Sequence, residues 1–353
     1  MHKLSSGRAR GLATLVVVVG LAAAVTSGAV GANQAATKTP PKLTIGFLNI
    51  LGASPATGRM QKQFQKAADM LGWKVKVIDA QGDPAKMSSG IQSFVTQKVS
   101  AILTIAVAPA AAHQALAAAK KAHIPAIVIG SPNPDPDHLY AAQISPNDSA
   151  LGAINAQFLC DTLGSGAKII AQEFSALDAL VRRDTVAEAL FKHCGVKIVA
   201  THQVDMANAV SDATKSTLNM LRANPGVKGV YADQDFEFAA AVNAIKQLGL
   251  QKKVKVFGFL AGAETLATLR KGGPAAGLAD AAYNDISWIA ANQFLMYFGE
   301  HKKIDPNAQY NDMYIPTALI TAANVPKVGD EYPYPDPAKT FVPRWKKLGY
   351  KLK

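Results

Sequence analysis

Thr44-Ile45-Gly46-Phe47-Leu48 is an apolar run that predicts a buried strand, and the residues after it decide the fold. Apolar side chains then recur at helical spacing from Met60 to Leu71, and Gly72 stands where a helix commonly ends. A second strand is predicted over residues 75–78. The sequence therefore predicts a strand, helix and strand in succession, as in folds with parallel sheets.

Residues 1–32 have the layout of a cleavable secretion signal. Three basic residues precede the apolar run 12–25, and small residues end at Ala32. That run is too short to span a bilayer comfortably, and no later stretch reaches about 18 consecutive apolar residues. A lipoprotein leader would need a cysteine at the cleavage site, and none is present there. We therefore expect a periplasmic or secreted protein, cleaved after Ala32 and without a lipid anchor.

Length and charge narrow the class of protein. The 353 residues include the predicted leader, and the remainder suits two domains of roughly 150 residues each. The formal net charge is +12, but the basic residues are scattered and not grouped with aromatic residues. This pattern favours a solvated surface over nucleic-acid binding.

The two cysteines, Cys160 and Cys194, each lie toward the end of a predicted helix. An exported protein can join such a pair in a disulfide, but two buried free thiols fit the same positions. The sequence leaves both alternatives open.

Strand and helix patterns alternate along the whole chain, which predicts an α/β fold of two doubly wound parallel-sheet lobes. One series ends at the strand 125–130, and the proline-rich stretch 131–138 interrupts the rhythm. A second series begins with the helix 149–163 and continues to a last strand near residues 314–321. The tail from Pro326 is expected to lie over the surface.

Several phrases in this order resemble the type I periplasmic sugar-binding proteins of ABC importers, especially the ribose-binding branch. They are Thr44–Phe47, Asp79-Ala80-Gln81-Gly82-Asp83-Pro84, Ile124-Pro125-Ala126-Ile127, Asn224-Pro225-Gly226-Val227, Ala232-Asp233-Gln234-Asp235 and Gly258-Phe259. The resemblance covers most of residues 43–321 and implies two lobes joined by three crossovers, near Asn147, Asp280 and Thr321. The first lobe would combine residues 43–147 and 281–320, and the second 148–280 and 321–353.

The resemblance also implies a function. A monomer would clamp a small solute, sugar-like or more apolar with a polar head, between its lobes and deliver it to an ABC transporter permease, with no cofactor and no catalysis. The same closure could instead signal to a chemoreceptor or a histidine kinase. The common nucleotide, zinc and hydrolase motifs are absent from the sequence, which disfavours an enzyme.

Ligands in open α/β sheets lie beyond the carboxyl ends of the strands. The positions that match the family's ligand contacts are Ser54, Ala56, Thr57, Gly130, Ser131, Arg183, Met206, Gln234, Leu260 and Asp280. Several depart from the sugar-binding pattern: small or aliphatic residues stand at its aromatic positions, Gly130-Ser131 replaces an Asp-Arg pair, and Leu260 replaces a second Asp. Such a site would bind ribose poorly, because buried hydroxyls without partners cost about 1–3 kcal/mol each.

The remaining polar candidates each have a structural alternative. Arg183 could bind a carboxylate or vicinal hydroxyls, or it could be a surface arginine paired with Asp178 or Asp184. Gln234 could contact ligand, or belong with Asp235 to a helix cap. Asp280 could contact ligand, or make a hydrogen bond at the hinge. The small polar residues Ser54, Thr57 and Ser131 are also ordinary turn formers.

A metal site is not expected. Asn133, Asp135 and Asp137 alternate like the start of a calcium loop, but His138 and Ile144 occupy the positions of its glycine and closing glutamate. The sequence therefore favours a plain proline-rich loop.

Overall fold

The computed structural model describes residues 38–329 and 331–353. The predicted signal peptide and its cleavage after Ala32 lie outside the described residues. Over the part of the chain that is described, no helix is both long and apolar enough to cross a bilayer.

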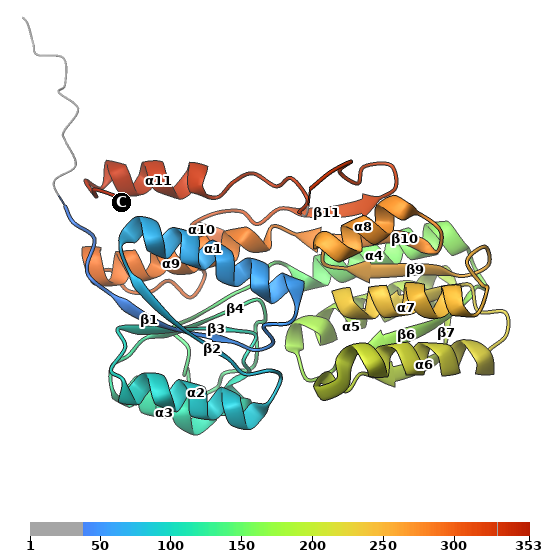
Figure 1. Cartoon of the computed structure of the whole chain (residues 1–353), viewed down its shortest axis with the longest axis horizontal. Coiled ribbons are helices and arrows are strands. Elements are labelled where there is room, and N and C mark those ends of the chain that lie inside the picture. Colours follow the sequence, from blue (N-terminus) through green and yellow to red (C-terminus); the bar gives the residue numbers. More distant parts are fainter. Residues whose placement is uncertain (1–37, 330) are drawn as a thin grey trace, which may run out of the picture. The chain divides into compact units, whose positions relative to one another are not determined.

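The first sheet is fully parallel, with the strand order β2-β1-β3-β4-β5. Its strands are β1 (Thr44–Asn49), β2 (Lys74–Asp79), β3 (Ala101–Ile105), β4 (Ala126–Ile129) and β5 (Ala142–Ile144). Its helices are α1 (Pro55–Leu71), α2 (Pro84–Thr96), η1 (Pro109–Ala112), α3 (His113–Lys121), α9 (Tyr283–Glu300) and the short α10 (Ala308–Asn311). We call this sheet and its helices the first lobe (Figure 1).

Strand β1 divides its side chains between the two faces of this sheet. Phe47 packs into the core that α1 and α9 cover, whereas Leu48 packs into the core under α2 and α3. On the α2 face, Gly46 leaves room for Phe94, since a Cβ at residue 46 would lie 2.5 Å from the Phe94 ring. Gly72 ends α1 in the left-handed conformation that glycine adopts without strain. The predicted strand, helix and strand are thus present, with helices on both faces.

The second sheet has the order β11-β10-β9-β8-β6-β7, parallel except where β11 pairs antiparallel with β10. Its strands are β6 (Lys168–Glu173), β7 (Lys197–Gln203), β8 (Gly229–Ala232), β9 (Lys255–Phe259), β10 (Ala275–Ala281) and β11 (Thr317–Thr321). Its helices are α4 (Asp148–Leu163), α5 (Asp178–Cys194), η2 (Met206–Asn208), α6 (Ala209–Ala223), α7 (Asp235–Gln247) and α8 (Ala263–Lys271). This sheet and its helices form the second lobe. Two doubly wound α/β lobes, as predicted, are therefore confirmed.

The end of the chain departs from the sequence-based expectation. Strand β11 belongs to the second sheet, so the predicted lobe boundary at residue 320 falls inside a strand. Beyond it, helix α11 (Ala338–Lys347) packs against α9 of the first lobe, where Trp345 stacks on Trp288 at 5.5 Å between ring centroids. Phe341 and Trp345 are fully buried. The tail was expected to lie over the surface, but at this helix two aromatic side chains are buried and complete the first lobe's core.

Cys160 and Cys194 are joined as a disulfide in the second lobe. The bond links the ends of α4 and α5, two helices that pack against each other. Of the two alternatives that the sequence left open, the structure has the disulfide.

Candidate functional site

Two adjoining cavities lie where the strands of both sheets end. The inner chamber has a volume of about 70 Å³ and the outer chamber about 410 Å³, and they share Leu51, Ser54 and Phe236 as a common wall. The first lobe contributes the loops after β1, β3 and β4, and the second lobe contributes the starts of α5 and α7 and the end of β9. This is the place where open α/β sheets hold their ligands.

Three strand ends that line the inner chamber turn through left-handed backbone. Gly130 has φ +85°, and glycine adopts this conformation freely. Ala106 and Leu260 have φ of +52° and +66°. For residues with a Cβ such a conformation carries strain of order 1–3 kcal/mol, and it occurs most often at functional sites. The turns bring the backbone itself to the chamber wall.

The inner chamber brings together most of the residues that the sequence proposed as ligand contacts. They are Ser54, Ala56, Thr57, Gly130, Arg183, Gln234 and Leu260. Ser131 and Asp280 do not line it. Met206 begins η2, and its side chain lies outside the described ones. Contact with ligand stays a prediction for all of them.

Arg183 is buried, with an exposed fraction of 2%. Its Nε and Nη2 donate to Asp148 Oδ1 at 3.0 and 2.8 Å, and Nη2 also donates to the Tyr283 hydroxyl at 2.8 Å. Its Nη1 donates to the carbonyl oxygen of Asp233 at 3.3 Å. The alternative of a surface arginine is wrong because Arg183 is buried, and the arginine that pairs with Asp178 is its exposed neighbour Arg182. Burial raises the pKa of Asp148 although Arg183 opposes that shift.

Asp280 makes the hydrogen bond that its structural alternative anticipated. Its Oδ1 accepts from the N–H of Ala261 at 3.0 Å and lies 3.6 Å from Arg59 Nη2. Arg59, on α1, also donates to the carbonyl oxygen of Ala261 at 3.1 Å and lies over the Tyr283 ring. Burial raises the pKa of Asp280, and the guanidinium opposes this.

Sequence reasoning missed Arg59. It stands on the same face of α1 as Ala56, Met60 and Phe64, all of which are buried. A charged residue within an apolar helical stripe was the signal available, because such a residue needs a buried partner. Its partner, Asp280, is far along the chain and could not be named from spacing.

Ser131 and Gln234 also have structural roles. Ser131 is buried, and its Oγ accepts from the N–H of Ala179 at the start of α5, 3.3 Å away. Gln234 precedes α7, where Glu237 Oε2 accepts from the backbone N–H groups of Asp233 and Gln234 at 2.7 and 3.0 Å. Glu237 therefore completes a capping box at the start of α7, and Asp235, which was expected to cap this helix, accepts from the N–H of Phe236 in its first turn.

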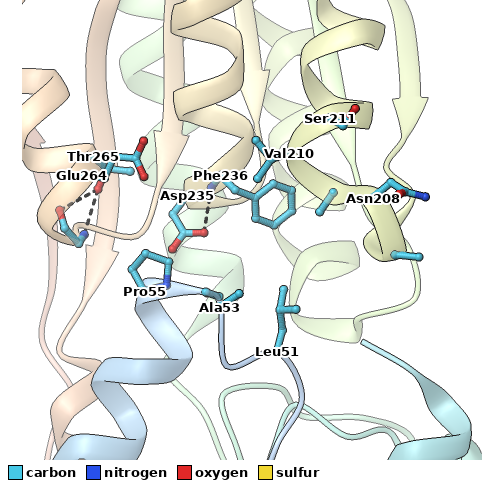
Figure 2. A pocket seen from close by; sticks show the side chains of 14 residues that line it. Leu51, Ala53, Pro55, Asn208, Val210, Ser211, Asp235, Phe236, Glu264 and Thr265 are labelled. Carbon is cyan, nitrogen blue, oxygen red and sulfur yellow. Dashed lines mark hydrogen bonds between the residues drawn. The ribbon is translucent and has the colours of Figure 1, made fainter. Parts of the chain in front are cut away.

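Asp235 lies on the wall of the outer chamber, close to Pro55 (Figure 2). It is 4% exposed; its Oδ1 accepts from the N–H of Phe236 at 2.9 Å. Within residues 38–329 and 331–353, Oδ2 has no hydrogen-bond partner. Burial raises the pKa of Asp235 to about 6, against the opposing effect of the N–H groups of Phe236 and Ala56. Sequence reasoning had assigned this residue to helix capping alone.

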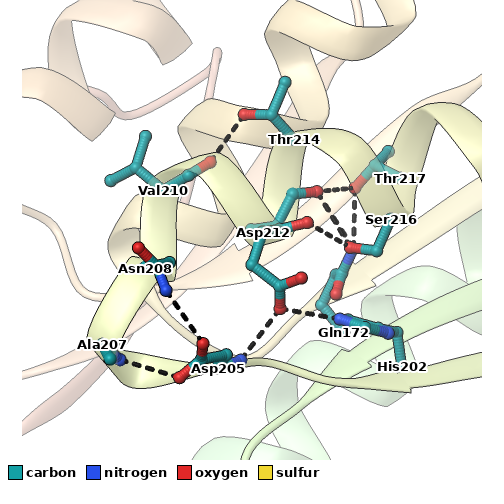
Figure 3. A network of polar contacts seen from close by, with 11 residues as sticks. Gln172, His202, Asp205, Ala207, Asn208, Val210, Asp212, Thr214, Ser216 and Thr217 are labelled. Carbon is teal, nitrogen blue, oxygen red and sulfur yellow. Dashed lines mark hydrogen bonds and ion pairs between the residues drawn. The ribbon is translucent and has the colours of Figure 1, made fainter.

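A polar network fixes the opposite wall of the outer chamber, at η2 and the start of α6 (Figure 3). Asp212 accepts from His202 Nε2 at 2.7 Å and from the N–H of Asp205 at 2.8 Å. Burial favours a higher pKa for Asp212, but these two contacts leave its pKa below the ordinary value. Behind them, Gln172 donates to Ser216 Oγ at 2.8 Å. The wall is therefore tied to strands β6 and β7.

The family of the chain follows from its sequence. The sequence model of the periplasmic binding protein domain matches residues 45–298. The chain belongs to this family. Within the family, it is 28% identical over 253 residues to the ribose import binding protein of Salmonella typhimurium, covering 70% of this chain and 79% of that protein. It is 29% identical over 200 residues to the Haemophilus influenzae ribose import binding protein, covering 55% of this chain and 65%, just under two thirds, of that protein.

Solved structures of periplasmic binding proteins share the fold. A galactofuranose binding protein superposes with a TM-score of 0.71 at 18% sequence identity, covering 87% of this chain and all of that one. The predicted family and fold are confirmed. Both of the sequence relatives are named as ribose import binding proteins. Among the described residues, no three His, Cys, Asp or Glu are placed together to hold a metal ion.

Proposed function

We propose that the protein is the extracytoplasmic solute-binding component of an ABC importer. It would enclose a small solute in the two chambers and deliver it to a membrane permease. The observation that carries this proposal is a cavity lined from both lobes at the carboxyl ends of their strands. The ribose import binding proteins among its relatives support the same role.

Direct contacts between the lobes support a hinge that closes around the solute. Ser131 of the first lobe accepts from the start of α5, Arg59 of α1 donates to Ala261, and Arg183 of α5 donates to Tyr283 of α9. These contacts join the two lobes directly. A solute that touches both lobes would add to them only in the closed state, and this differential binding would shift the population toward closure.

We further propose that the chain is exported with cleavage after Ala32 and acts as a monomer. The basic and apolar leader supports export. N-terminal sequencing of exported protein should begin at Asn33, and light scattering should give the mass of one chain. A start many residues later, or retention of Met1, would contradict the cleavage site.

The binding function is tested with purified protein lacking the leader. Screening by thermal shift should identify a solute that raises the melting temperature, because ligand that binds only the folded state stabilises it. Small-angle scattering should then show compaction on binding. Gln234→Ala should lower the affinity for that solute about 2- to 10-fold, because it removes a hydrogen bond in the inner chamber.

Gln247→Ala is the matched control, because Gln247 is exposed at the far end of the same helix. Uptake of the labelled solute by cells that lack the protein should return when the protein is restored. If binding causes no compaction, or if uptake does not depend on the protein, the importer role is wrong.

A further inference from the structure

We infer that the C-terminal tail is a stiff strap that holds the two lobes together and limits how far the cleft between them opens. The strap consists of residues 325–329 and 331–347, and it ends in helix α11. It would act whichever solute the cleft takes, so the inference goes beyond the proposed function.

One end of the strap is fixed to the second lobe. Val325 follows strand β11 and packs against the core of the second sheet, as Tyr332 does further along. Arg270, on α8, donates from Nε to the carbonyl oxygen of Pro326 at 2.6 Å, and its Nη2 donates to the carbonyl oxygen of Gly329. The second lobe therefore holds this end by apolar packing and by two hydrogen bonds to the backbone.

The other end is fixed to the first lobe by α11. The rings of Phe341 and Trp345 are fully buried, and both stack on Trp288 of α9. The indole Nε1 of Trp345 also donates to Asn292 Oδ1 at 2.9 Å. Because large aromatic side chains dominate the energy of burial, α11 cannot leave the first lobe without a large cost.

Between these two ends the strap is short and stiff. Prolines at positions 333, 335 and 337 fix φ at three of five successive residues, and the residue before each proline is restricted to extended backbone. Tyr332 packs against the second sheet's core, whereas Tyr334 packs against the core that contains Trp288. The chain therefore passes from one lobe to the other over two residues, which leaves little slack.

The strap also touches the hinge, where β10 of the second lobe leads into α9 of the first. Asn284, in the first turn of α9, donates from Nδ2 to Glu331 Oε2 at 2.9 Å. The Tyr334 hydroxyl lies near Asp280 of β10, because burial and then the charge of Asp280 raise the pKa of this tyrosine. A change in the angle between the lobes would therefore move these hinge residues against the strap.

All of these contacts are made while the lobes touch each other, through Ser131 and Ala179 and through Arg59 and Ala261. Opening the cleft must therefore stretch the stiff segment or break the contacts at one of its ends. The end held by Arg270 is the weaker one, because its hydrogen bonds are exposed or partly buried. The strap favours the closed population, and release at Arg270 would let the lobes open further.

Spin labels on one exposed position in each lobe measure the opening directly. Gln92→Cys on α2 and Asn219→Cys on α6 provide these positions, and both helices lie on the side of the molecule away from α11 (Figure 1). The native cysteines are bonded to each other and take no label. Pulsed dipolar spectroscopy on the protein without solute then gives the distribution of distances between the lobes.

Two variants loosen the strap at different points. Pro333→Gly combined with Pro335→Gly gives the segment slack, and both prolines are exposed, so little packing is lost. Arg270→Ala frees the end on the second lobe. None of these residues lines either chamber. Each strap variant should broaden the distribution and lengthen the mean distance by several ångström.

Pro134→Gly combined with Pro136→Gly is the matched control. These prolines have the same spacing and are also exposed, but they lie in a loop within the first lobe. Each pair of substitutions gives the unfolded chain the same extra freedom, so both should lower the urea midpoint to a similar extent. The control should keep the distance distribution of the unchanged protein.

A longer distance in either strap variant, with the control unchanged, supports the strap. The inference is overturned if both strap variants keep the original distribution, or if the control opens as far as they do. Neither result bears on the importer role, which solute-induced compaction and uptake decide.

Discussion

Arg183→Ala is expected to destabilise the protein strongly, because Arg183 and Asp148 form a buried ion pair. The pair joins Arg183 Nη2 to Asp148 Oδ1 at 2.8 Å, and both side chains are almost fully buried. Removing one partner of such a pair leaves an uncompensated buried charge, which costs about 3–5 kcal/mol. Urea unfolding should therefore show a loss of that size in the free energy of unfolding, with the slope unchanged.

Two further variants separate charge from lost packing. Arg182→Ala removes the neighbouring arginine, whose pair with Asp178 is exposed, and should cost about 0.3–0.5 kcal/mol. Arg183→Met combined with Asp148→Leu removes both charges and keeps apolar volume, so it should recover most of the loss. The reasoning is refuted if Arg183→Ala costs no more than Arg182→Ala, or if the double variant is as unstable as the single one.

Three other outcomes follow from the structure. Replacing Cys160 and Cys194 by serine should lower the free energy of unfolding by about 3–4 kcal/mol, because the bond closes a loop with a sequence separation of 34 residues; an unchanged urea midpoint would contradict this. The free energy of unfolding should fall as the pH rises from about 4 through about 6, because burial raises the pKa of Asp235 to about 6 and the folded protein holds a proton there that the unfolded chain has released; urea unfolding between pH 4 and 7 checks this, and Asp235→Asn should reduce the fall. Ribose should bind no tighter than micromolar, and a sub-micromolar calorimetric affinity would contradict the departures from the sugar-binding pattern.

The site was predictable as a location but not as a set of contacts. Strand ends can be found from apolar runs, so the order of residues along the chain is enough to place Gly130, Gln234 and Leu260 at a common edge. Which partner each polar side chain would take could not be found in this way. The structural alternative for Arg183 named Asp178 or Asp184 as its partner, both close in sequence, but its carboxylate partner is Asp148 on another helix.

The sequence alone was enough to predict where the strands and helices of this protein lie. Periodic apolar residues specify which segments form strands and helices, and Gly72 ends α1 as a glycine in left-handed backbone does. The tertiary structure alone decided the pairings between distant segments: Arg59 with Asp280, and Trp345 on Trp288. Periodicity records that a side chain is buried but not what covers it, because burial depends on the face of an element and the partner depends on how the elements pack.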